Sequence, residues 1–217
     1  MIVDERIITF INSLDTKNSE ILEDIEREAL ADNVPIIRRE MQSFLKVLLM
    51  VKKPMRVLEV GTAVGFSALL MSEYVPEECA ITTIENYEKR IPIARENFIR
   101  AEKEEQITLL EGDAKDVLET LTEPFDLIFM DAAKGQYMNF LPRVLELLQP
   151  EGILISDNVL QDGDIIESRF AVTRRNRTIH KRMREYLYTL THSEELTTAV
   201  LPVGDGITIS TKKGRKA

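Results

Sequence analysis

The sequence predicts an α/β fold: a mostly parallel sheet with helices on both faces, a C-terminal antiparallel hairpin and an N-terminal helical cap. From residue 56 to residue 156, short runs of apolar and β-branched residues alternate with longer helical patterns. That alternation is typical of parallel strands joined by helical crossovers. Near the C-terminus the alternation stops, and two strand-like runs flank Gly204-Asp205-Gly206, a tight-turn signal that predicts an antiparallel pair.

The individual elements follow from spacing and from stop signals. Apolar residues at 21, 22, 25 and 29 give residues 19–31 a helical pattern, and Pro54 helps to stop a second helix over 38–51. We expect core strands at 56–60, 80–84, 107–110, 126–130 and 152–156. Helices are expected between them, near 65–74, 88–103, 114–121 and 137–148. The final strands are expected at 197–203 and 207–211.

Length and composition predict one domain over residues 1–217, with a helical cap at 1–53 and an α/β core at 54–217. The 217 residues are 44% hydrophobic, and no Ser/Pro/Gly-rich linker divides them. The charged start lacks a secretory signal pattern and no apolar run could span a bilayer, so we expect a cytoplasmic protein. A single cysteine, Cys79, excludes an intramolecular disulfide, and with only two histidines any metal should be held by oxygen.

The most informative segment is the strand and glycine turn at residues 57–65. Val57, Leu58 and Val60 form a buried-strand pattern, while Gly61 and Gly65 allow positive φ and a close backbone approach before a helix. This arrangement suits a nucleotide-like cofactor. The glycines lack the G-x-G-x-x-G spacing that suits a pyrophosphate, which argues against NAD. The alternative is that the glycines only let the helix pack closely on the strand.

Two acidic residues at later strand ends extend the cofactor hypothesis. Glu85 ends the second strand, 24 residues after Gly61, and an acid near that distance commonly accepts hydrogen bonds from ribose hydroxyls. Asp113 follows the third strand, where it and the adjoining backbone are expected near the adenine edge. The alternative for Glu85 is a solvated acid with no ligand.

Oxygen-bearing side chains follow two further strands. Asp131 ends the strand at 126–130, and Asp157 and Asn158 end the strand at 152–156. Because ligands of open α/β sheets bind outside the carboxyl ends of the strands, these three side chains are expected to converge. Two carboxylates and an amide carbonyl suit a hard divalent ion such as Mg²⁺. The alternative is that each acid only caps a helix or holds a loop.

Four motifs together resemble the metal-dependent O-methyltransferase family that includes catechol and caffeoyl-CoA O-methyltransferases. They are Glu59-Val-Gly-Thr-Ala-Val-Gly-Phe-Ser, Asp131-Ala-Ala-Lys-Gly-Gln-Tyr, Asp157-Asn-Val and Pro202-Val-Gly-Asp-Gly-Ile. The resemblance covers roughly residues 33–212 and extends to small bacterial members, including the tRNA 5-hydroxyuridine methyltransferase. It implies a Rossmann-like seven-stranded methyltransferase sheet, S-adenosylmethionine, Mg²⁺ or another divalent ion, and commonly a homodimer.

The resemblance also assigns roles to residues. It implies cofactor contacts at Met41, Glu59, Gly61, Ser67, Glu85, Asp113, Ala114 and Asp131. It implies metal ligands at Asp131, Asp157 and Asn158, and Lys134 takes the place of the catalytic lysine beside Asp131. Lys134 could remove the hydroxyl proton, act as a stabilising cation, or lie on the surface without either role. The extra acidic residue that catechol enzymes place on the second hydroxyl has no counterpart, which argues against strict catechol specificity.

Charge bears on the choice of acceptor. The chain carries a formal charge of −9, yet residues 169–184 contain seven basic residues and no acid, which leaves 21 basic against 37 acidic residues elsewhere. We expect the segment 158–190 on the substrate side, with tRNA phosphates at Arg174, Arg175, Arg177 and Lys181. The alternatives are a solvated helix face, or a site for a phosphorylated small molecule such as an acyl-CoA.

These observations favour a metal-dependent O-methyltransferase acting on 5-hydroxyuridine at the tRNA wobble position, giving 5-methoxyuridine. A phenol-like hydroxyl is a poor nucleophile at neutral pH, and a divalent cation lowers its pKa. Chelation needs a second oxygen, which 5-hydroxyuracil provides at O4 and a catechol provides at its second hydroxyl. A small catechol or hydroxycinnamoyl ester is therefore the alternative acceptor. A non-catalytic nucleotide-binding module is the alternative from another class, and a dinucleotide-dependent oxidoreductase fits less well.

Overall fold

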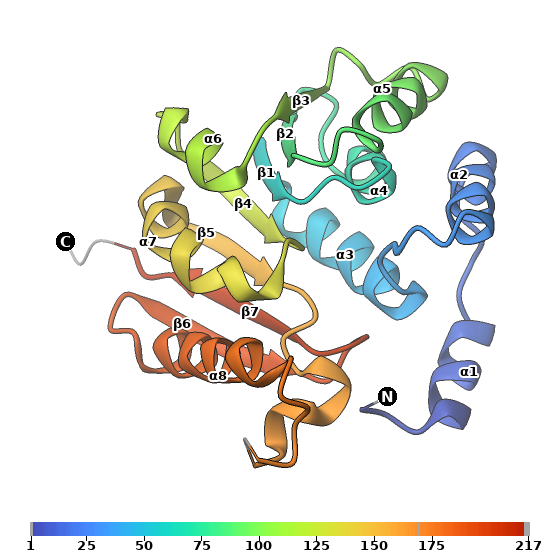
Figure 1. Cartoon of the computed structure of the whole chain (residues 1–217). Helices are drawn as coiled ribbons and strands as arrows, with labels where there is room; N and C mark the ends of the chain where they lie inside the picture. The colour runs from blue at the N-terminus through green and yellow to red at the C-terminus, as the bar shows by residue number, and fades with distance from the viewer. Residues whose placement is uncertain (1, 169, 215–217) are drawn as a thin grey trace.

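The computed structural model describes residues 2–168 and 170–214, which form a seven-stranded sheet of order β3-β2-β1-β4-β5-β7-β6 (Figure 1). The five parallel strands are β1 (Arg56–Val60), β2 (Ala80–Glu85), β3 (Ile107–Glu111), β4 (Phe125–Met130) and β5 (Leu148–Ser156). The strand β7 (Ile207–Lys212) runs antiparallel to both β5 and β6 (Leu196–Leu201). The expected fold class, with its reversed final hairpin, is confirmed.

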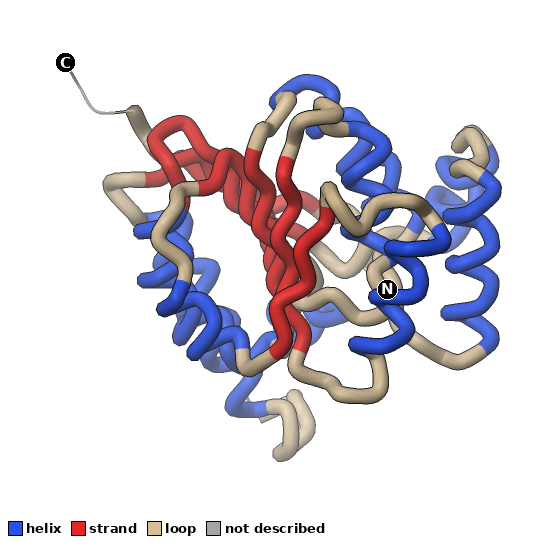
Figure 2. The backbone as a smooth tube through the Cα atoms, turned by 90° about the horizontal axis from the view of Figure 1, so that it is seen from above, coloured by secondary structure: helices blue, strands red, loops and turns tan. Residues whose placement is uncertain are grey.

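Helices cover both faces of the sheet (Figure 2). One face packs against α2 (Glu20–Ala31), α3 (Arg39–Lys52), α4 (Phe66–Tyr74) and α5 (Ile91–Arg100). The other packs against α6 (Ala114–Thr120), α7 (Tyr137–Leu147) and α8 (Arg177–His192). The helix α1 (Glu5–Ser13) contacts α3, and the 3₁₀ turns η1 (Lys134–Gln136) and η2 (Gln161–Ile166) follow β4 and β5.

The central strands bury side chains on both faces of the sheet. In β4, Leu127 and Phe129 belong to the core beneath α2 to α5, whereas Ile128 and Met130 belong to the core beneath α6 to α8. All four are fully buried, which explains why the strand has no polar alternation. Burial of each such side chain contributes about 1.5–3 kcal/mol, so this strand anchors the two cores to each other.

Several boundaries differ from those expected. The helix expected at 88–103 spans Ile91–Arg100, because Pro92 suits the first turn of a helix and fixes its start. The helix α1 was not expected: Asp4 caps its first turn, but none of its residues is buried. The strand β5 begins at Leu148, before a register shift against β4. Within the described residues, no helix is long and apolar enough to cross a membrane.

Candidate active site

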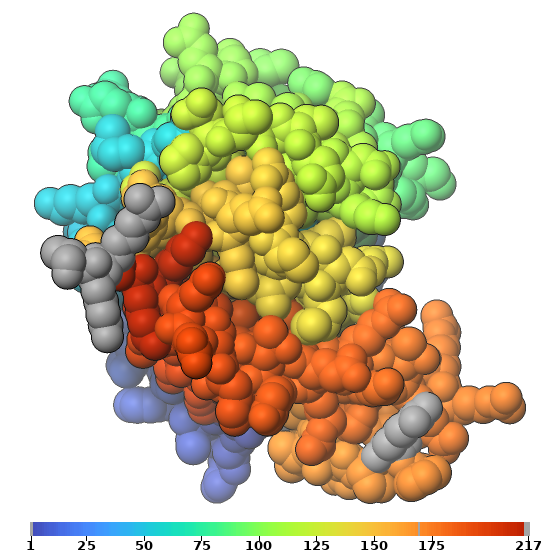
Figure 3. Space-filling model, turned by 90° about the vertical axis from the view of Figure 1, so that its left-hand side faces the viewer, coloured from blue at the N-terminus to red at the C-terminus, as the bar shows by residue number. Residues whose placement is uncertain are grey.

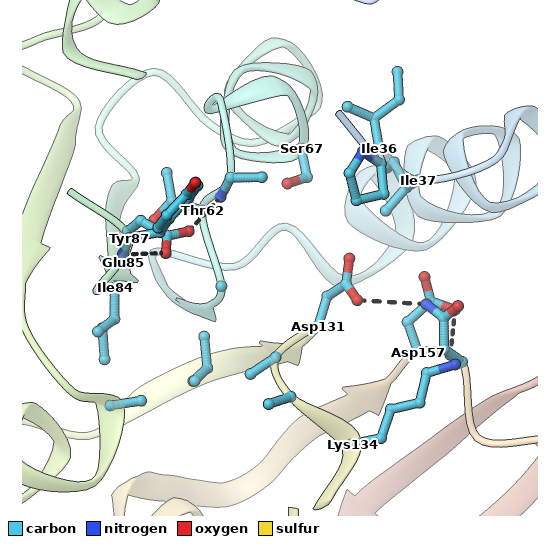
Figure 4. A pocket seen from close by; sticks show the side chains of 18 of the residues that line it. Ile36, Ile37, Thr62, Ser67, Ile84, Glu85, Tyr87, Asp131, Lys134 and Asp157 are labelled. Carbon is cyan, nitrogen blue, oxygen red and sulfur yellow. Dashed lines mark hydrogen bonds between the residues drawn. The ribbon is translucent and has the colours of Figure 1, made fainter. Parts of the chain in front are cut away.

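A cavity of about 670 Å³ lies at the carboxyl ends of the parallel strands, as the fold predicts. Figure 4 shows its two ends: Glu85, Tyr87 and Thr62 at one, and Asp131, Asp157 and Lys134 at the other. The expected residues that line it are Met41, Gly61, Ser67, Glu85, Asp113, Ala114, Asp131, Lys134, Asp157 and Asn158. These residues come from β2, from α3, α4 and α6, from η1, and from the loops that follow β1, β3, β4 and β5.

The glycine turn after β1 forms one wall of this cavity. Gly61 has a φ of +107°, and a Cβ at this position would collide with the backbone carbonyl of Asp131. Gly65, with a φ of +85°, packs against the ring of Phe98 and starts α4. Both glycines are therefore required by close packing as well as by backbone conformation. Their packing brings the turn against the strand end that carries Asp131.

Glu85 is held by backbone donors. Its Oε1 accepts hydrogen bonds from the amides of Asn86 and Tyr87, at 3.0 and 2.8 Å, and its Oε2 accepts one from the amide of Ala63 at 2.8 Å. The side chain is only 8% exposed but lines the cavity. A carboxylate has about four acceptor positions, so it retains capacity toward a ligand. The bond to Ala63 also ties the end of β2 to the glycine turn.

Glu59 lies behind the cavity wall and does not line the cavity. It accepts hydrogen bonds from the hydroxyls of Ser67 and Thr83, each at 2.5 Å, and Thr83 in turn contacts the hydroxyl of Thr62. Complete burial raises the pKa of Glu59 to about 7, against the lowering effect of the two hydroxyls. The geometry makes Glu59 a support for Thr62 and Ser67, which do line the cavity.

The strand ends of β4 and β5 bring three oxygen-bearing side chains together. Hydrogen bonds between Asp131 N and Val60 O, and between Asp157 N and Met130 O, continue the strand pairing to this edge. Asn158 Nδ2 lies 3.4 Å from Asp131 Oδ1, and the amide of Asn158 donates to Asp157 Oδ1 at 2.6 Å. The expected convergence of Asp131, Asp157 and Asn158 is therefore present in the structure. Figure 4 shows Asp131 and Asp157 at the same end of the cavity.

This end of the cavity is electrostatically unfavourable for its own carboxylates. Burial raises the pKa of Asp131 to about 6, despite the nearby Lys134 and the amide of Asn158. Burial, together with the negative charge of Asp131, raises the pKa of Asp157 to about 7. No cluster of three or more His, Cys, Asp or Glu suited to a metal occurs in the described part of the chain. The candidate set is instead two carboxylates and one amide, which fits a hard divalent cation.

Two tyrosines brace these strand ends from behind. The hydroxyl of Tyr137 lies 3.0 Å from the backbone carbonyl oxygens of both Met130 and Asp157 and donates to them. Its ring packs edge-on against Tyr186, with 5.3 Å between centroids, and the Tyr186 hydroxyl bonds Ser156 Oγ at 2.6 Å. Both tyrosines are fully buried. The spacing of Asp131 and Asp157 is thereby fixed by α7 and α8.

Lys134 forms an ion pair that the sequence did not predict. Its Nζ lies 3.4 Å from Oδ2 of Asp205, which is 4% exposed and lines the same cavity. Asp205 also accepts a hydrogen bond from the amide of Asp162, and Asp162 pairs with Arg38 at 3.6 Å. In the sequence, Gly204-Asp205-Gly206 predicts a tight turn and belongs to one of the four motifs of the resemblance, but Asp205 was not predicted as a site residue. The sequence signal for Asp205 as a site residue is an acid between two glycines. The burial of Asp205 depends on tertiary packing, which the sequence pattern does not show.

The basic segment lies outside the cavity. Arg174, Arg175, Arg177 and Lys181 do not line it, and Arg169 falls outside the described residues. Arg177 donates to the backbone carbonyls of Val172 and Phe170, and Lys181 pairs with Glu185 at 3.5 Å. Arg174 and Arg175 are exposed in the turn before α8. Figure 3 shows this part of the chain, in orange, projecting from the body of the molecule.

The comparisons with known proteins agree with this geometry. An O-methyltransferase family model matches residues 12–213. Caffeoyl-CoA O-methyltransferase 2 of Populus trichocarpa is 31% identical over 177 residues, which cover 76% of this chain and 70% of the relative. Catechol O-methyltransferase of Niastella koreensis is 33% identical over 128 residues, covering 57% of this chain and 58% of the relative. The aligned part thus spans less than two thirds of that catechol enzyme.

Solved structures show the same fold over nearly the whole chain. A Staphylococcus aureus protein provisionally named a caffeoyl-CoA O-methyltransferase gives a TM-score of 0.88 at 31% identity, covering 96% of this chain and all of that one. A Podospora anserina methyltransferase with SAH bound gives 0.87 at 26% identity, covering 96% and 94%. The chain therefore belongs to the O-methyltransferase family. Membership favours a methyltransferase enzyme over an oxidoreductase or a non-catalytic module.

Proposed function

We propose that this chain is an S-adenosylmethionine- and metal-dependent O-methyltransferase whose acceptor is 5-hydroxyuridine at the tRNA wobble position, giving 5-methoxyuridine. The observation that carries the proposal is the convergence of Asp131, Asp157, Asn158 and Lys134 at one end of a cavity that presents Glu85 at its other end. A nucleoside-bearing methyl donor fits one end, and an acceptor with two adjacent oxygens fits the other.

The cofactor end suits the adenosine of S-adenosylmethionine. Glu85 would accept the ribose hydroxyls, and Asp113 with Ala114, at the start of α6, line the region expected to hold the adenine. Met41, Gly61 and Ser67 line the same cavity. The SAH bound to the Podospora anserina relative supports this assignment. Glu59 would act indirectly, through its hydrogen bonds to Ser67 and Thr83.

The metal end suits a divalent ion such as Mg²⁺. Asp131, Asp157 and Asn158 would hold it, because two neighbouring carboxylates whose pKa values are raised gain most from a nearby cation. When bound, such an ion lowers the pKa of an adjacent hydroxyl, while S-adenosylmethionine supplies an electrophilic methyl group. The protein contributes the alignment, since Tyr137 and Tyr186 fix the two strand ends that carry the carboxylates.

Lys134 would stabilise negative charge on the acceptor oxygen. Its ammonium group lines the cavity and contacts the buried carboxylate of Asp205, which indicates that it interacts as a cation. A cationic role predicts that Lys134→Arg keeps more activity than Lys134→Gln. A base role predicts that both variants lose activity equally, because an arginine does not give up its proton at physiological pH. Comparing the kcat of the two variants decides between the roles.

The tRNA acceptor is supported by the concentration of positive charge after the metal motif. Arg174 and Arg175 are exposed there, whereas the guanidinium of Arg177 donates hydrogen bonds to the backbone carbonyls of Val172 and Phe170. Fewer side chains are therefore available to phosphates than the sequence indicates. A cytoplasmic location is part of the proposal, because tRNA is modified there. The second candidate acceptor is a small hydroxylated aromatic, favoured by the catechol and caffeoyl-CoA names of the relatives.

Nucleoside mass spectrometry of tRNA separates these acceptors. We expect tRNA from cells lacking the gene to contain 5-hydroxyuridine in place of 5-methoxyuridine, and the purified protein with S-adenosylmethionine and Mg²⁺ to restore the methyl group. Catechol and caffeoyl-CoA serve as competing acceptors in the same assay. Unchanged tRNA nucleosides, together with efficient methylation of either small acceptor, would replace the tRNA proposal by the second candidate.

A homodimer is also part of the proposal, and exposed apolar residues support it. Ile7, Phe10 and Ile11 on α1, together with Leu14 directly after it, are 47–67% exposed. The helix α1 packs against α3, where Val47, Met50 and Val51 are 61–77% exposed. Exposed apolar side chains on neighbouring helices are commonly found at interfaces. Sedimentation equilibrium should give twice the chain mass, and Phe10→Glu with Val51→Glu should give monomers. A monomeric wild-type protein would contradict the dimer.

A further inference from the structure

We infer that Arg182 on α8 is a positioning residue for Lys134, an inference that rests on the proposed function. The guanidinium of Arg182 donates a hydrogen bond from Nη1 to the backbone carbonyl of Gly135, at 2.8 Å. Gly135 is the residue that follows Lys134. The helix α8 is therefore hydrogen-bonded to the turn η1, which carries Lys134.

The turn that carries Lys134 is short. It is a single 3₁₀ turn, η1, between the end of β4 and the start of α7, closed by a hydrogen bond of 2.8 Å from Gln136 N to Ala133 O. A 3₁₀ turn has poorer hydrogen-bond geometry than an α-helix and is weak by itself. Its position therefore depends on what packs against it. A lysine side chain on a displaced turn would lose its place relative to Asp205 and to Asp131.

The helix α8 offers a firm support for that turn. It buries Met183, Tyr186 and Leu190 in the core that it shares with α7 and the sheet. Its Ile179 lies beside Gly135 together with Arg182, so the turn meets an apolar contact as well as a charged donor. Tyr186 also reaches Ser156, next to Asp157, through its hydroxyl. The helix α8 thus contacts both Ser156, which precedes Asp157, and Gly135, which follows Lys134.

The hydrogen bond suits a positioning role because the donor is charged. Charge-assisted bonds are stronger than neutral ones, and a planar guanidinium loses little freedom in forming them. Within the described residues, no carboxylate lies within ion-pair distance of Arg182, so the bond to Gly135 is its specific contact. Because misplacement of about 1 Å can cost up to about a hundredfold in rate, loss of this bond should lower turnover.

The test compares Arg182→Gln with Arg184→Gln. Arg184 is a matched control, because it lies on the same helix and donates in the same way, from Nη1 to the carbonyl of Ile165 at 2.9 Å. Both variants remove one positive charge, so any loss of RNA affinity is shared. With tRNA containing 5-hydroxyuridine, we expect kcat to fall about tenfold in Arg182→Gln. We expect KM for S-adenosylmethionine to stay within about twofold, and Arg182→Lys to recover part of the loss. Equal kcat values in the two glutamine variants would overturn the inference.

A second readout does not depend on turnover. Acetylation of Lys134 by an amine-reactive ester is measured by peptide mass spectrometry, with the exposed Lys115 as an internal reference. We expect the Lys134 rate to rise several-fold in Arg182→Gln and not in Arg184→Gln, because the amine leaves Asp205. Unchanged labelling in Arg182→Gln would overturn the inference. If labelling changes as expected while wild-type protein methylates no tRNA, the proposed acceptor fails and the positioning role stands.

Discussion

The two ends of the cavity are built on opposite electrostatic principles. At the cofactor end, Glu85 already accepts three backbone hydrogen bonds, and Thr62 and Ser67 connect through hydroxyls to the buried Glu59. At the metal end, Asp157 is buried and Asp131 is half-buried, and the pKa values of both are raised. The carboxylate of the first end is satisfied by backbone donors, whereas the second end holds three carboxylates, Asp131, Asp157 and Asp205, against the one cation Lys134. The cofactor end should therefore be preformed, and the metal end should depend on a cation.

The largest expected effect comes from removing one carboxylate at the metal end. Asp157→Ala should lower kcat by about 10³-fold, because the divalent ion contributes several kcal/mol of transition-state stabilisation. The affinity for S-adenosylmethionine, measured by calorimetry, should change little, because Glu85 and its partners are untouched. A variant that keeps wild-type turnover, or that loses cofactor binding in parallel, would show that the two ends are not separate.

The repulsion between the carboxylates of the metal end should also lower the stability of the metal-free protein as they ionise. Both acids titrate near 3.8 in an unfolded chain, but the folded protein raises the pKa of Asp131 to about 6 and that of Asp157 to about 7. A raised carboxyl pKa means that the folded state binds more protons between these limits, so stability falls as the pH rises from about 4 to about 7.

Denaturant unfolding in EDTA at several pH values measures this loss. Asp157→Asn removes one of the interacting charges and should be more stable than the wild type at pH 8, with little difference at pH 4. Mg²⁺ at pH 8 should stabilise the wild type and leave the variant nearly unchanged. The opposite slope with pH would refute the electrostatic description of this end.

At the cofactor end, removing the ribose acceptor should have a smaller effect. Glu85→Ala should weaken S-adenosylmethionine binding by about 1.5–3 kcal/mol, since charge-assisted hydrogen bonds are lost. Glu111→Ala is the matched control, because Glu111 ends the neighbouring strand in register with Glu85 but is exposed and paired with Arg95. Equal dissociation constants for the Glu85 variant and the wild type would remove Glu85 from the cofactor site.

The smallest effect is expected outside the cavity, at the exposed arginines before α8. If Arg174 and Arg175 contact tRNA phosphates, replacing each by Gln should reduce the salt slope of tRNA binding by about 0.7–0.9. Lys17 and Arg27 are the control, because they are exposed on the part of the chain that packs on the other face of the sheet. An identical slope in both double variants would exclude Arg174 and Arg175 as phosphate contacts.

The residues of the cofactor end were easier to predict from sequence than the residues that surround the candidate metal ligands. Gly61, Gly65 and Glu85 depend on local rules for strand ends and turns, and the structure places them as those rules expect. Asp131, Asp157 and Asn158 were also predictable, because parallel strands present their carboxyl ends at one edge. Asp205 and Arg38 were not, since they reach the cavity from the hairpin turn and from the segment before α3.

Three further differences between the sequence predictions and the structure concern Glu59, the basic segment and α1. The motif predicts Glu59 in direct contact with the cofactor, but the alternation of β1 turns its side chain toward Ser67 and Thr83, away from the cavity. Phosphate contacts were predicted at Arg174, Arg175, Arg177 and Lys181. Of these, Arg177 donates to backbone carbonyls and Lys181 pairs with Glu185. The helix α1 was not predicted, and none of its residues is buried in the structure. Sequence spacing shows which residues share a helix face, but it does not show which groups of the protein those residues contact.

Calorimetric titration of Mg²⁺ into protein saturated with S-adenosylmethionine tests the central contrast most directly. The wild type, freed of metal with EDTA and exchanged into buffer at pH 8, should bind the cofactor first and then one equivalent of Mg²⁺. The Asp157→Ala protein should bind the cofactor with nearly the same affinity and show no Mg²⁺ binding. A wild-type protein that binds the cofactor but takes up no Mg²⁺, or an Asp157→Ala protein that binds Mg²⁺ as tightly as the wild type, would contradict the account.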